Sequence, residues 1–356
     1  MKNKIGFIVI LLALVGCGSG DADSTEVTPD MMVQQGDSAM MMPEADMETV
    51  TVPDAGIAPD EGIGNPPPAG GDPDEGEPQA YVEPAALAAG QDGPDPGPRP
   101  NCNDASVSRI RGWVVDRIGR PIEGAKAQLC VVGSDGVTNC LRPSDSTADG
   151  VFNIDIGEEY QCLNQAAFRV IKPGSGRAPM YCNANLPEPG SDTRMVLNEP
   201  FVLYAGIPAA ILPPAGDEMM ARTVTFANGV ELDIAPFDLV SPYAELGMRT
   251  VGTDERGLCF LEGQTMPTRL YAFSPDSTIY GEANIRFPNE TELAPGSKVD
   301  ISLLGGLGCE RNGEHVAEGA WTSIGLGTVN EDGSMIIADE GTVLTCLTWV
   351  GYTPAQ

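Results

Sequence analysis

Alternating apolar and polar residues, in short runs separated by turn formers, dominate the chain from residue 105 onward. Alternation with a period of two is typical of half-buried β-strands, and Gly, Asp, Asn and Pro between the runs indicate turns. We see no long helical periodicity between 105 and 200. In that region we expect strands over residues 109–116, 125–132, 151–156 and 167–171. Strands with turn signals about every ten residues predict a β-sandwich.

Residues 201–356 show the same texture. Asn228-Gly229 and Asp332-Gly333 each lie between two alternating runs, and such dipeptides are the strongest short-range signal for a β-hairpin. A further strand is expected over 299–303. We therefore predict an all-β fold class with two β-sandwich domains, the first over residues 105–200 and the second over the remainder.

The start of the chain has the pattern of an export signal. Lys2 and Lys4 are basic, an apolar run of eleven residues follows over 5–15, and small residues precede Cys17. This run is too short to span a bilayer as a helix, which needs about 20 residues. We interpret residues 1–16 as a signal peptide.

The ending Leu14-Val15-Gly16-Cys17 resembles the lipobox of bacterial lipoproteins. The resemblance implies cleavage before Cys17, lipidation of its sulfur and acylation of the new N-terminus, which together make a firm membrane anchor. The alternative is an ordinary secretory signal with a chance cysteine. Gly18 favours, by the same family pattern, a lipid-anchored protein of the outer membrane, on its periplasmic face or at the cell surface.

Residues 17–104 read as a disordered acidic tether. The stretch 18–101 holds 14 of the 31 prolines and 18 acidic residues against one basic residue, Arg99. Such a composition buries too little apolar surface to offset the entropy of ordering. The whole chain has a net charge of −31 and no basic patch, so nucleic-acid binding is excluded as a function class.

An acidic tract inside this tether offers an alternative to a plain spacer. It contains Asp72, Asp74, Glu75 and Glu77, whose carboxylates could bind calcium. Calcium needs six to eight oxygens around a defined loop, and no EF-hand spacing is present. The residues therefore favour a solvated spacer.

Three sequence blocks in the first domain resemble the carboxypeptidase regulatory-like family. They are GWVVD at 112–116, GRPIEGA at 119–125 and TADGVF at 147–152, in the family's order. Gly119 and Gly124 suit the positive φ of tight turns. The resemblance implies a seven-stranded transthyretin-like sandwich without peptidase activity, since this domain is an accessory to the enzyme.

The second domain loosely resembles the ZU5-like sandwiches of bacterial surface proteins. The blocks that carry this weaker resemblance are Phe287-Pro288, ELAPG at 292–296, Trp321 with GLGTV at 325–329, and Asp332-Gly333. Any turn-rich sandwich could show similar blocks.

Eight cysteines besides Cys17 suggest disulfides, because an exported chain meets an oxidising compartment. They are Cys102, Cys130, Cys140, Cys162, Cys182, Cys259, Cys309 and Cys346. Cys130 and Cys140 lie symmetrically about a turn and are expected to pair. Five cysteines lie in the first region and three in the second, so complete pairing requires a bridge between the regions, with Cys102 as the natural candidate.

Motifs for catalysis are absent from the sequence. His315 is the only histidine, which removes multi-histidine metal sites and most catalytic arrangements. We expect it on a loop or strand start, in a structural or exposed role. The glycine-rich stretch 305–308 leads into a cysteine and reads as a turn or bulge. Trp113, Trp321 and Trp349 are expected in the core.

We therefore expect a non-enzymatic, membrane-anchored surface lipoprotein with a structural or binding role in adhesion, envelope assembly or ligand capture. Its contacts would be the membrane through the lipid, and a protein or glycan ligand. Exposed strand edges could accept a partner strand. We assign no catalytic residue, cofactor or metal. A glycan-binding module is the alternative, and a carboxylate-dependent hydrolase is the third.

Replacing the cysteine of the lipobox tests the anchor. We expect Cys17→Ser to release the protein from membranes, because the lipid is the only anchor that the sequence offers. Cell fractionation and intact-mass analysis measure this. A serine variant that still sediments with outer membranes, together with a wild type that carries no acyl mass, would refute the lipoprotein assignment.

Overall fold

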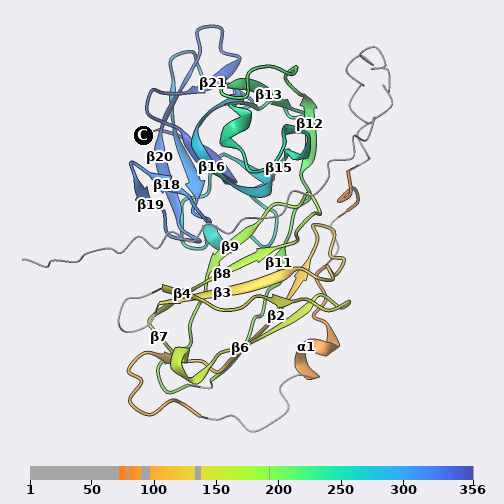
Figure 1. Cartoon of the computed structure of the whole chain (residues 1–356), viewed down its shortest axis with the longest axis vertical. Coiled ribbons are helices and arrows are strands. Elements are labelled where there is room, and N and C mark those ends of the chain that lie inside the picture. The colour runs from red at the N-terminus through yellow and green to blue at the C-terminus, as the bar shows by residue number, and fades with distance from the viewer. Residues whose placement is uncertain (1–71, 78–79, 90–96, 133–137, 192, 356) are drawn as a thin grey trace, which may run out of the picture. The chain divides into compact units, whose positions relative to one another are not determined.

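The computed structural model describes residues 72–77, 80–89, 97–132, 138–191 and 193–355. The signal peptide over 1–16, the lipidation candidate Cys17 and the expected tether up to residue 71 lie outside the described residues. Among the described residues no helix is long and apolar enough to cross a membrane. Helix α1 (Ala85–Ala89) is a single short turn beside β2 (Figure 1).

The first sandwich contains short strands from the first third of the described chain, as the alternation predicts. Their bounds are β1 (Ala105–Ser106), β2 (Arg109–Val115), β3 (Lys126–Val132), β4 (Thr138–Cys140), β5 (Ser144–Asp145), β6 (Val151–Asp155), β7 (Cys162–Leu163), β8 (Gln165–Ile171), β9 (Met180–Asn183), β10 (Arg194–Val196) and β11 (Phe201–Val202), with a 3₁₀ turn η1 (Glu158–Tyr160). The four strands expected from the sequence are confirmed, each to within two residues.

Two sheets form this sandwich (Figure 1). In one, β2 is central, with β6 antiparallel on one side and β10 and β11 parallel on the other. In the other, β3 pairs with β8 and β8 with β9, while β4 and β5 pair with the outer side of β3. Trp113, Phe152 and Phe168 fill the space between the sheets and are at most 2% exposed. Gly119 and Gly124 have the expected positive φ, at 89° and 65°.

The second region is also all β. Its strands are β12 (Ile207–Ile211), β13 (Arg222–Phe226), β14 (Glu231–Ile234), β15 (Gly247–Val251), β16 (Arg269–Pro288), β17 (Lys298–Leu304), β18 (Glu310–Arg311), β19 (Glu314–His315), β20 (Trp321–Val329), β21 (Met335–Ala338) and β22 (Leu344–Pro354), with 3₁₀ turns η2 (Pro236–Asp238), η3 (Tyr243–Glu245) and η4 (Cys259–Leu261). Both hairpins expected from Asn-Gly and Asp-Gly dipeptides are present, and the all-β fold class is confirmed.

The long strand β16 holds this second sandwich together. Its first part pairs with β15 and β22, and its last part pairs with β14 and β21. The ladder therefore closes through β16, and each of the nine described strands of this sheet has partners on both sides. Closure therefore leaves none of these nine strands unpaired along a whole side, although residues 321–326 of β20 pair in the ladder only with β17.

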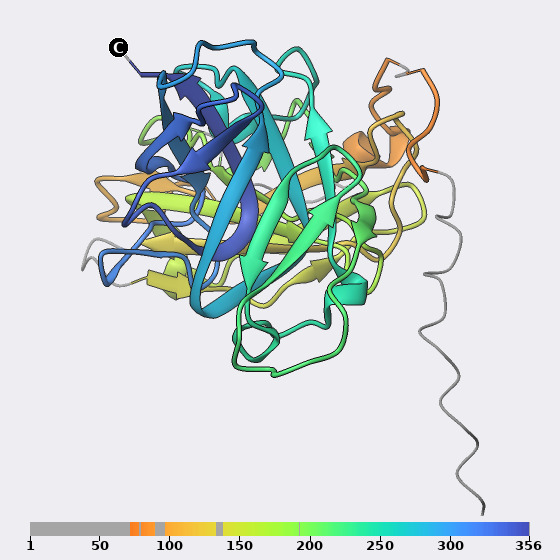
Figure 2. The same cartoon turned by 90° about the horizontal axis from the view of Figure 1, so that it is seen from above.

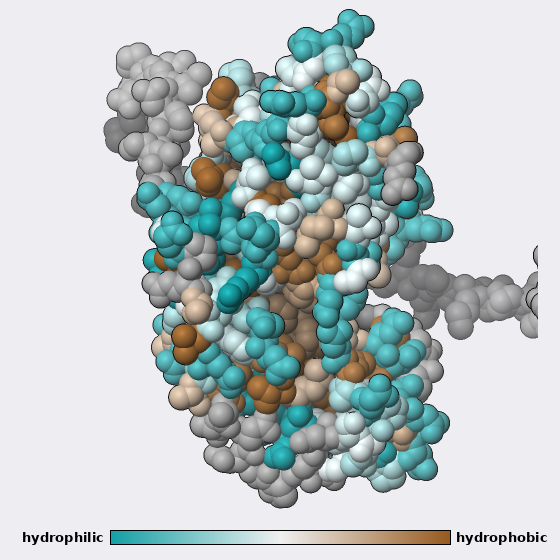
Figure 3. All heavy atoms as spheres, turned by 180° about the vertical axis from the view of Figure 1, so that it is seen from behind, coloured by the Kyte–Doolittle hydropathy of each residue, from teal (hydrophilic) through white to brown (hydrophobic). Residues whose placement is uncertain are grey.

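The two sandwiches share apolar core. One continuous buried cluster contains the interior of the first sandwich together with Phe260, Leu270, Leu304 and Trp349 from the second region. The Trp349 ring lies 5.1 Å from that of Phe260 and 5.5 Å from that of Tyr204, between centroids. Seen from above, strands of the second sandwich cross over those of the first (Figure 2). Apolar atoms gather near the level at which the two meet (Figure 3).

Four disulfides connect the eight described cysteines. Cys130–Cys140 joins the paired strands β3 and β4, as predicted. The expected bridge between the regions exists, but it is Cys182–Cys259, between β9 and η4. The choice of Cys102 for that bridge was wrong: β1 pairs with β7, which brings Cys102 to Cys162. Cys309–Cys346 lies inside the second sandwich.

The bridge between the regions should stabilise the fold more than the local one. Cys182–Cys259 spans 77 residues and Cys130–Cys140 spans 10. Chain entropy then predicts about 4.5 kcal/mol for the first and about 2.7 kcal/mol for the second. Chemical denaturation of the two double-alanine variants, Cys182→Ala/Cys259→Ala and Cys130→Ala/Cys140→Ala, measures the difference. Equal losses, or a free Cys182 in a non-reduced digest, would contradict this connectivity.

Candidate functional site at the junction of the two sandwiches

An acidic turn at residues 72–76 is seated where the two sandwiches meet. Asp72 at the first position and Pro73 at the second are the residues that a β-turn prefers there. The amide of Glu75 donates to the Asp72 carbonyl at 2.9 Å, and the amide of Asp74 donates to the Asp72 carboxylate, also at 2.9 Å. The turn therefore presents two carboxylates in a fixed geometry. We call residues 72–76 the acidic turn.

The Asp74 side chain is the buried centre of the site that holds the acidic turn, which we call the seat. It is fully buried, at 0% exposed. Arg177, from the loop between β8 and β9, donates to one carboxylate oxygen at 3.0 Å, and the amide of Ala205 donates to the other at 2.7 Å. A buried carboxylate is tolerated only when it is paired and hydrogen-bonded, and both conditions are met here.

Arg249 is the residue through which the second sandwich binds the acidic turn. It lies on β15, is 7% exposed, and donates to the Asp72 carboxylate through Nη2 and to the Ala205 carbonyl through Nε, the latter at 2.6 Å. Partial burial would raise the pKa of Asp72, but the hydrogen bond and charge of Arg249 outweigh it and hold that pKa below its usual value. This contribution to stability is present above the unfolded pKa and is lost as the pH falls through the lowered value.

Two further arginines, from the turn after β2, close over the backbone of the acidic turn. Arg120 donates to the Pro73 carbonyl at 2.6 Å, and its Nε is held by the buried carboxylate of Asp116 at 2.6 Å. Arg117 donates to the Gly76 carbonyl at 3.3 Å and forms an ion pair with Glu255 of the second region at 2.8 Å. Four arginines, three from the first sandwich and one from the second, thus surround one turn.

The chain after the acidic turn continues along the first sandwich. Leu87 on α1 is 0% exposed within its core, and Arg111 on β2 donates to the Ala86 carbonyl at 2.7 Å. The Tyr81 ring lies 5.3 Å from the guanidinium of Arg256, and burial raises the pKa of its hydroxyl to about 12.

The expectation of a solvated tether through residue 104 is therefore wrong for this segment. The considered calcium tract also has another explanation, because the Asp72 and Asp74 carboxylates are bound by arginines. Composition missed the site because its arginines lie at 117, 120, 177 and 249, far from the acidic residues in sequence. The Asp-Pro-Asp turn pattern is the local signal that could have suggested an ordered segment.

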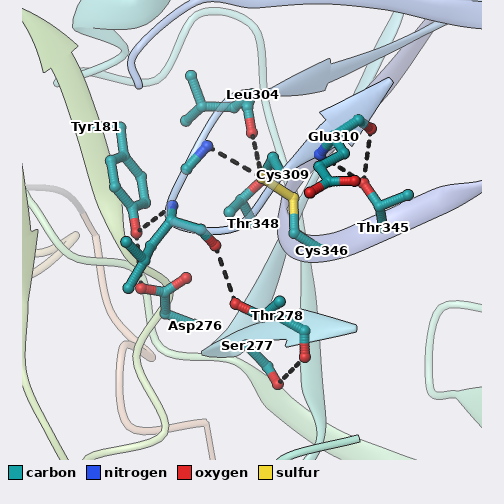
Figure 4. The surroundings of a disulfide bond; sticks show 12 residues. Tyr181, Asp276, Ser277, Thr278, Leu304, Cys309, Glu310, Thr345, Cys346 and Thr348 are labelled. Carbon is teal, nitrogen blue, oxygen red and sulfur yellow. Dashed lines mark hydrogen bonds between the residues drawn. A yellow bond between two sulfur atoms is a disulfide. The ribbon is translucent and has the colours of Figure 1, made fainter. Parts of the chain in front are cut away.

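A second polar cluster connects the sandwiches beside the acidic turn. The Tyr181 hydroxyl on β9 donates to the Asp276 carboxylate on β16 at 2.7 Å, and Arg169 on β8 donates to both at 2.8 to 3.0 Å. Tyr181 also accepts the amide of Leu307 at 3.3 Å (Figure 4). Burial raises the pKa of Tyr181 far above its usual value, so the hydroxyl keeps its proton.

A groove of about 600 Å³ lies between these two clusters. Arg169 and Asp276 line one part of it, and Arg177 and Glu245 line another. Both arginines are already paired with carboxylates, so the groove is close to charge-balanced. The Trp349 indole, buried behind the junction, donates to the Pro179 carbonyl at 2.6 Å and fixes β22 against the first sandwich.

The remaining residues singled out from the sequence do not assemble into a catalytic site within the described part of the chain. His315 is exposed on β19, as expected, and residues 305–308 form a turn. Glu318 lies near Cys130 and Cys140, but those sulfurs form a disulfide and cannot serve as thiolate ligands. Trp113 and Trp349 are in the core as predicted, whereas Trp321 is half-buried.

Comparison with known proteins identifies no family. No protein-family model matches the chain, and no curated protein matches it. Solved structures of low similarity include a streptococcal ancillary pilin (11% identity, 65% of this chain and 50% of that one, TM-score 0.18) and a DUF3823 family protein from Parabacteroides merdae (10% identity, 69% and 100%, TM-score 0.19). A third is BcpA, the major pilin subunit of Bacillus cereus (11% identity, 69% and 95%, TM-score 0.18).

These likenesses carry no argument about this chain, because the TM-scores are far below those of a shared fold. The chain spans about half the length of the streptococcal pilin structure that it matches. The resemblances to carboxypeptidase regulatory-like and ZU5-like domains are tested by none of them and stay predictions.

Removing the buried carboxylate should open the acidic turn without unfolding the sandwiches. In Asp74→Ala, Arg177 and the Ala205 amide lose their shared acceptor, and breaking such a buried pair costs about 3 kcal/mol. We expect the Ala205 amide to exchange with solvent roughly a hundredfold faster. Hydrogen exchange measured by mass spectrometry or NMR reports this.

Glu77→Ala is the matched control, because it removes the same charge from an exposed side chain of the same segment. It should leave exchange at Ala205 unchanged. Equal exchange rates in both variants would mean that Asp74 does not hold the turn in its seat.

Proposed function

We propose that the protein is a non-enzymatic, lipid-anchored surface lipoprotein of the outer membrane, whose two sandwiches form one rigid unit held directly by the anchoring chain. The observation that carries this proposal is the acidic turn, which is bound by arginines of both sandwiches. A structural or binding role follows, in which the unit presents its outer surface away from the membrane.

The path of the chain supports this role. A lipid on Cys17 would hold the N-terminal end, and the acidic turn is the first described part of the chain after it. Any pull from the membrane would then reach Asp72 and Asp74 before it reaches a strand of either sandwich. Because the turn contacts both sandwiches, load would be shared between them rather than applied to one edge strand.

Covalent bonds support the same role. Once the acidic turn and α1 are pulled free, the next fixed point is Cys102, which is bonded to Cys162. Cys182–Cys259 then connects the first sandwich to the second. To extend the chain beyond Cys102, a pulling force would have to separate strands. Disulfides close the chain into loops there, and these loops limit the length that can be released.

Glycan capture is the second candidate for the binding role, and a hollow on the second sandwich, lined by Tyr280, Glu282 and Arg311, favours it. The hydrolase alternative would need a catalytic carboxyl group beside a nucleophile, and the described residues give it little support. Glu318 is half-buried and its pKa is raised by burial, but the two cysteines beside it, Cys130 and Cys140, form a disulfide and offer no thiol nucleophile.

Single-molecule stretching tests the load-bearing role. When the oxidised full chain is pulled from its N-terminus, we expect one early event that releases the roughly 30 residues between Asp72 and Cys102. The gain is about 100 Å at about 3.4 Å per residue. The event comes before strand separation because side-chain contacts hold the acidic turn, whereas ladders and disulfides hold the rest.

Asp74→Ala should remove the early event or lower its force, and Glu77→Ala should not. Reduction of the disulfides should leave the early event and lengthen the later ones. An early event that is absent from the wild type, or one that Asp74→Ala leaves unchanged, would rule out load transfer through the acidic turn.

A further inference from the structure

The strand β16 bulges outward where it turns between the two layers of the second sandwich. Thr278 pairs with Cys346 and Ala283 pairs with Leu344, so four residues of β16 lie opposite the single residue Thr345. Ile279 of this bulge points inward and is 5% exposed, whereas Tyr280 points outward and is 75% exposed. Bulges of this kind re-aim side chains and are frequent next to functional sites.

A rigid hairpin stands across from this bulge. Strands β18 and β19 are joined by Asn312-Gly313, both with positive φ, which is the geometry of a tight two-residue turn. The Cys309–Cys346 disulfide fixes the base of the hairpin to β22. The Thr345 hydroxyl accepts the amide of Glu310 at 2.9 Å and donates to its carbonyl at 2.7 Å (Figure 4).

Between the bulge and the hairpin is a hollow of about 460 Å³, which we call the cup. Ile324, which is 8% exposed, and Val343 give it an apolar part. Tyr280 and Glu282 come from the bulge, while Arg311 and Asn312 come from the hairpin. The volume is in the range of small-ligand sites, which are about 300–1,000 Å³.

The polar groups of the cup are free to bind a ligand. Within the part of the chain that the structure describes, neither the Arg311 guanidinium nor the Glu282 carboxylate forms an ion pair or a side-chain hydrogen bond. The cup offers a planar cation, an amide and carboxylates of Glu282 and Glu310, together with one exposed aromatic ring. These are donors and acceptors for hydroxyl groups beside a surface for C–H groups.

This chemistry fits a sugar better than other ligands. Two carboxylates against one guanidinium would repel a polyanion, which excludes phosphorylated ligands and nucleic acid. A peptide bound by strand addition would pair its backbone with a strand edge, whereas the cup presents mainly the side chains of its bulge and hairpin. A neutral pyranose has a C–H face for the tyrosine and a rim of hydroxyls for the other groups.

We propose that the cup binds one unit of a neutral saccharide, stacked on Tyr280 and hydrogen-bonded by Glu282, Arg311 and Asn312. The proposal names a ligand class for the binding role proposed above and rests on it. The two walls are held by a closed sheet and by a disulfide, so the backbone that carries the binding side chains loses little freedom on binding, which favours affinity.

Ligand titration of the full chain tests the cup. The probes are glucose, galactose, mannose, N-acetylglucosamine and their β-linked disaccharides, followed by saturation-transfer NMR at up to millimolar concentration. We expect at least one probe to bind the wild type, and we expect Tyr280→Ala and Arg311→Ala each to weaken it about tenfold. Tyr280→Phe should keep most of the affinity, because the ring and not the hydroxyl stacks on the sugar.

Ile211→Ala is the matched control, since Ile211 is 62% exposed on β12, away from the cup. It should bind like the wild type. Absence of binding by every probe, or equal binding by wild type, Tyr280→Ala and Arg311→Ala, overturns the proposal, and so does a peptide that binds at Tyr280 when no sugar does. Tyr280 lies outside the acidic turn, so this failure would leave the stretching result, and hence the load-bearing role, unaffected.

Discussion

The arrangement of the described chain depends on one interaction, the binding of the buried Asp74 carboxylate by Arg177 and by the Ala205 amide. Burying an unpaired carboxylate would lower the stability of the fold by several kcal/mol. The acidic turn can therefore be buried only where cationic side chains and backbone amides bind its carboxylates. Asp74 itself is bound by Arg177 of the first sandwich and by the Ala205 amide, which lies between the sandwiches. Arg249 of the second sandwich binds the neighbouring Asp72 and the Ala205 carbonyl, so the complete set of partners exists only when the sandwiches are together. The converse also holds, since an empty seat would leave the cationic side chains of Arg177 and Arg249 with fewer partners.

Three kinds of force act at the same junction and restrict different motions. Apolar contact of Trp349 and Phe260 with the core of the first sandwich opposes separation but has little directional preference. The indole hydrogen bond to Pro179 and the Arg169–Tyr181–Asp276 cluster oppose sliding and rotation, because hydrogen bonds depend on angle. The Cys182–Cys259 disulfide sets an upper limit on any opening. The two sandwiches therefore act as one body.

The sequence predicted what local chemistry decides. Hairpins at Asn228-Gly229 and Asp332-Gly333 follow from turn preferences, and Cys130–Cys140 follows from its symmetry about one turn. The seat of the acidic turn could not be predicted, because Asp74 meets partners more than 100 residues away. Parity of the cysteines required a bridge between the regions, yet it could not choose Cys182 over Cys102, because that choice depends on the long-range pairing of β1 with β7.

Closure of the second sandwich also explains where a binding surface can arise. A strand that passes from one layer to the other needs extra residues at the corner, and β16 places them between Thr278 and Ala283. Closure of the sheet requires Ile279 to point inward, but it does not require any particular side chain at position 280. A small polar residue would be sufficient there. A tyrosine held 75% exposed there is not explained by folding, nor is the neighbouring Arg311, which has no ion pair with any residue that the structure describes. The same corner that closes the sheet thus provides a rigid rim on which ligand-binding side chains can be placed.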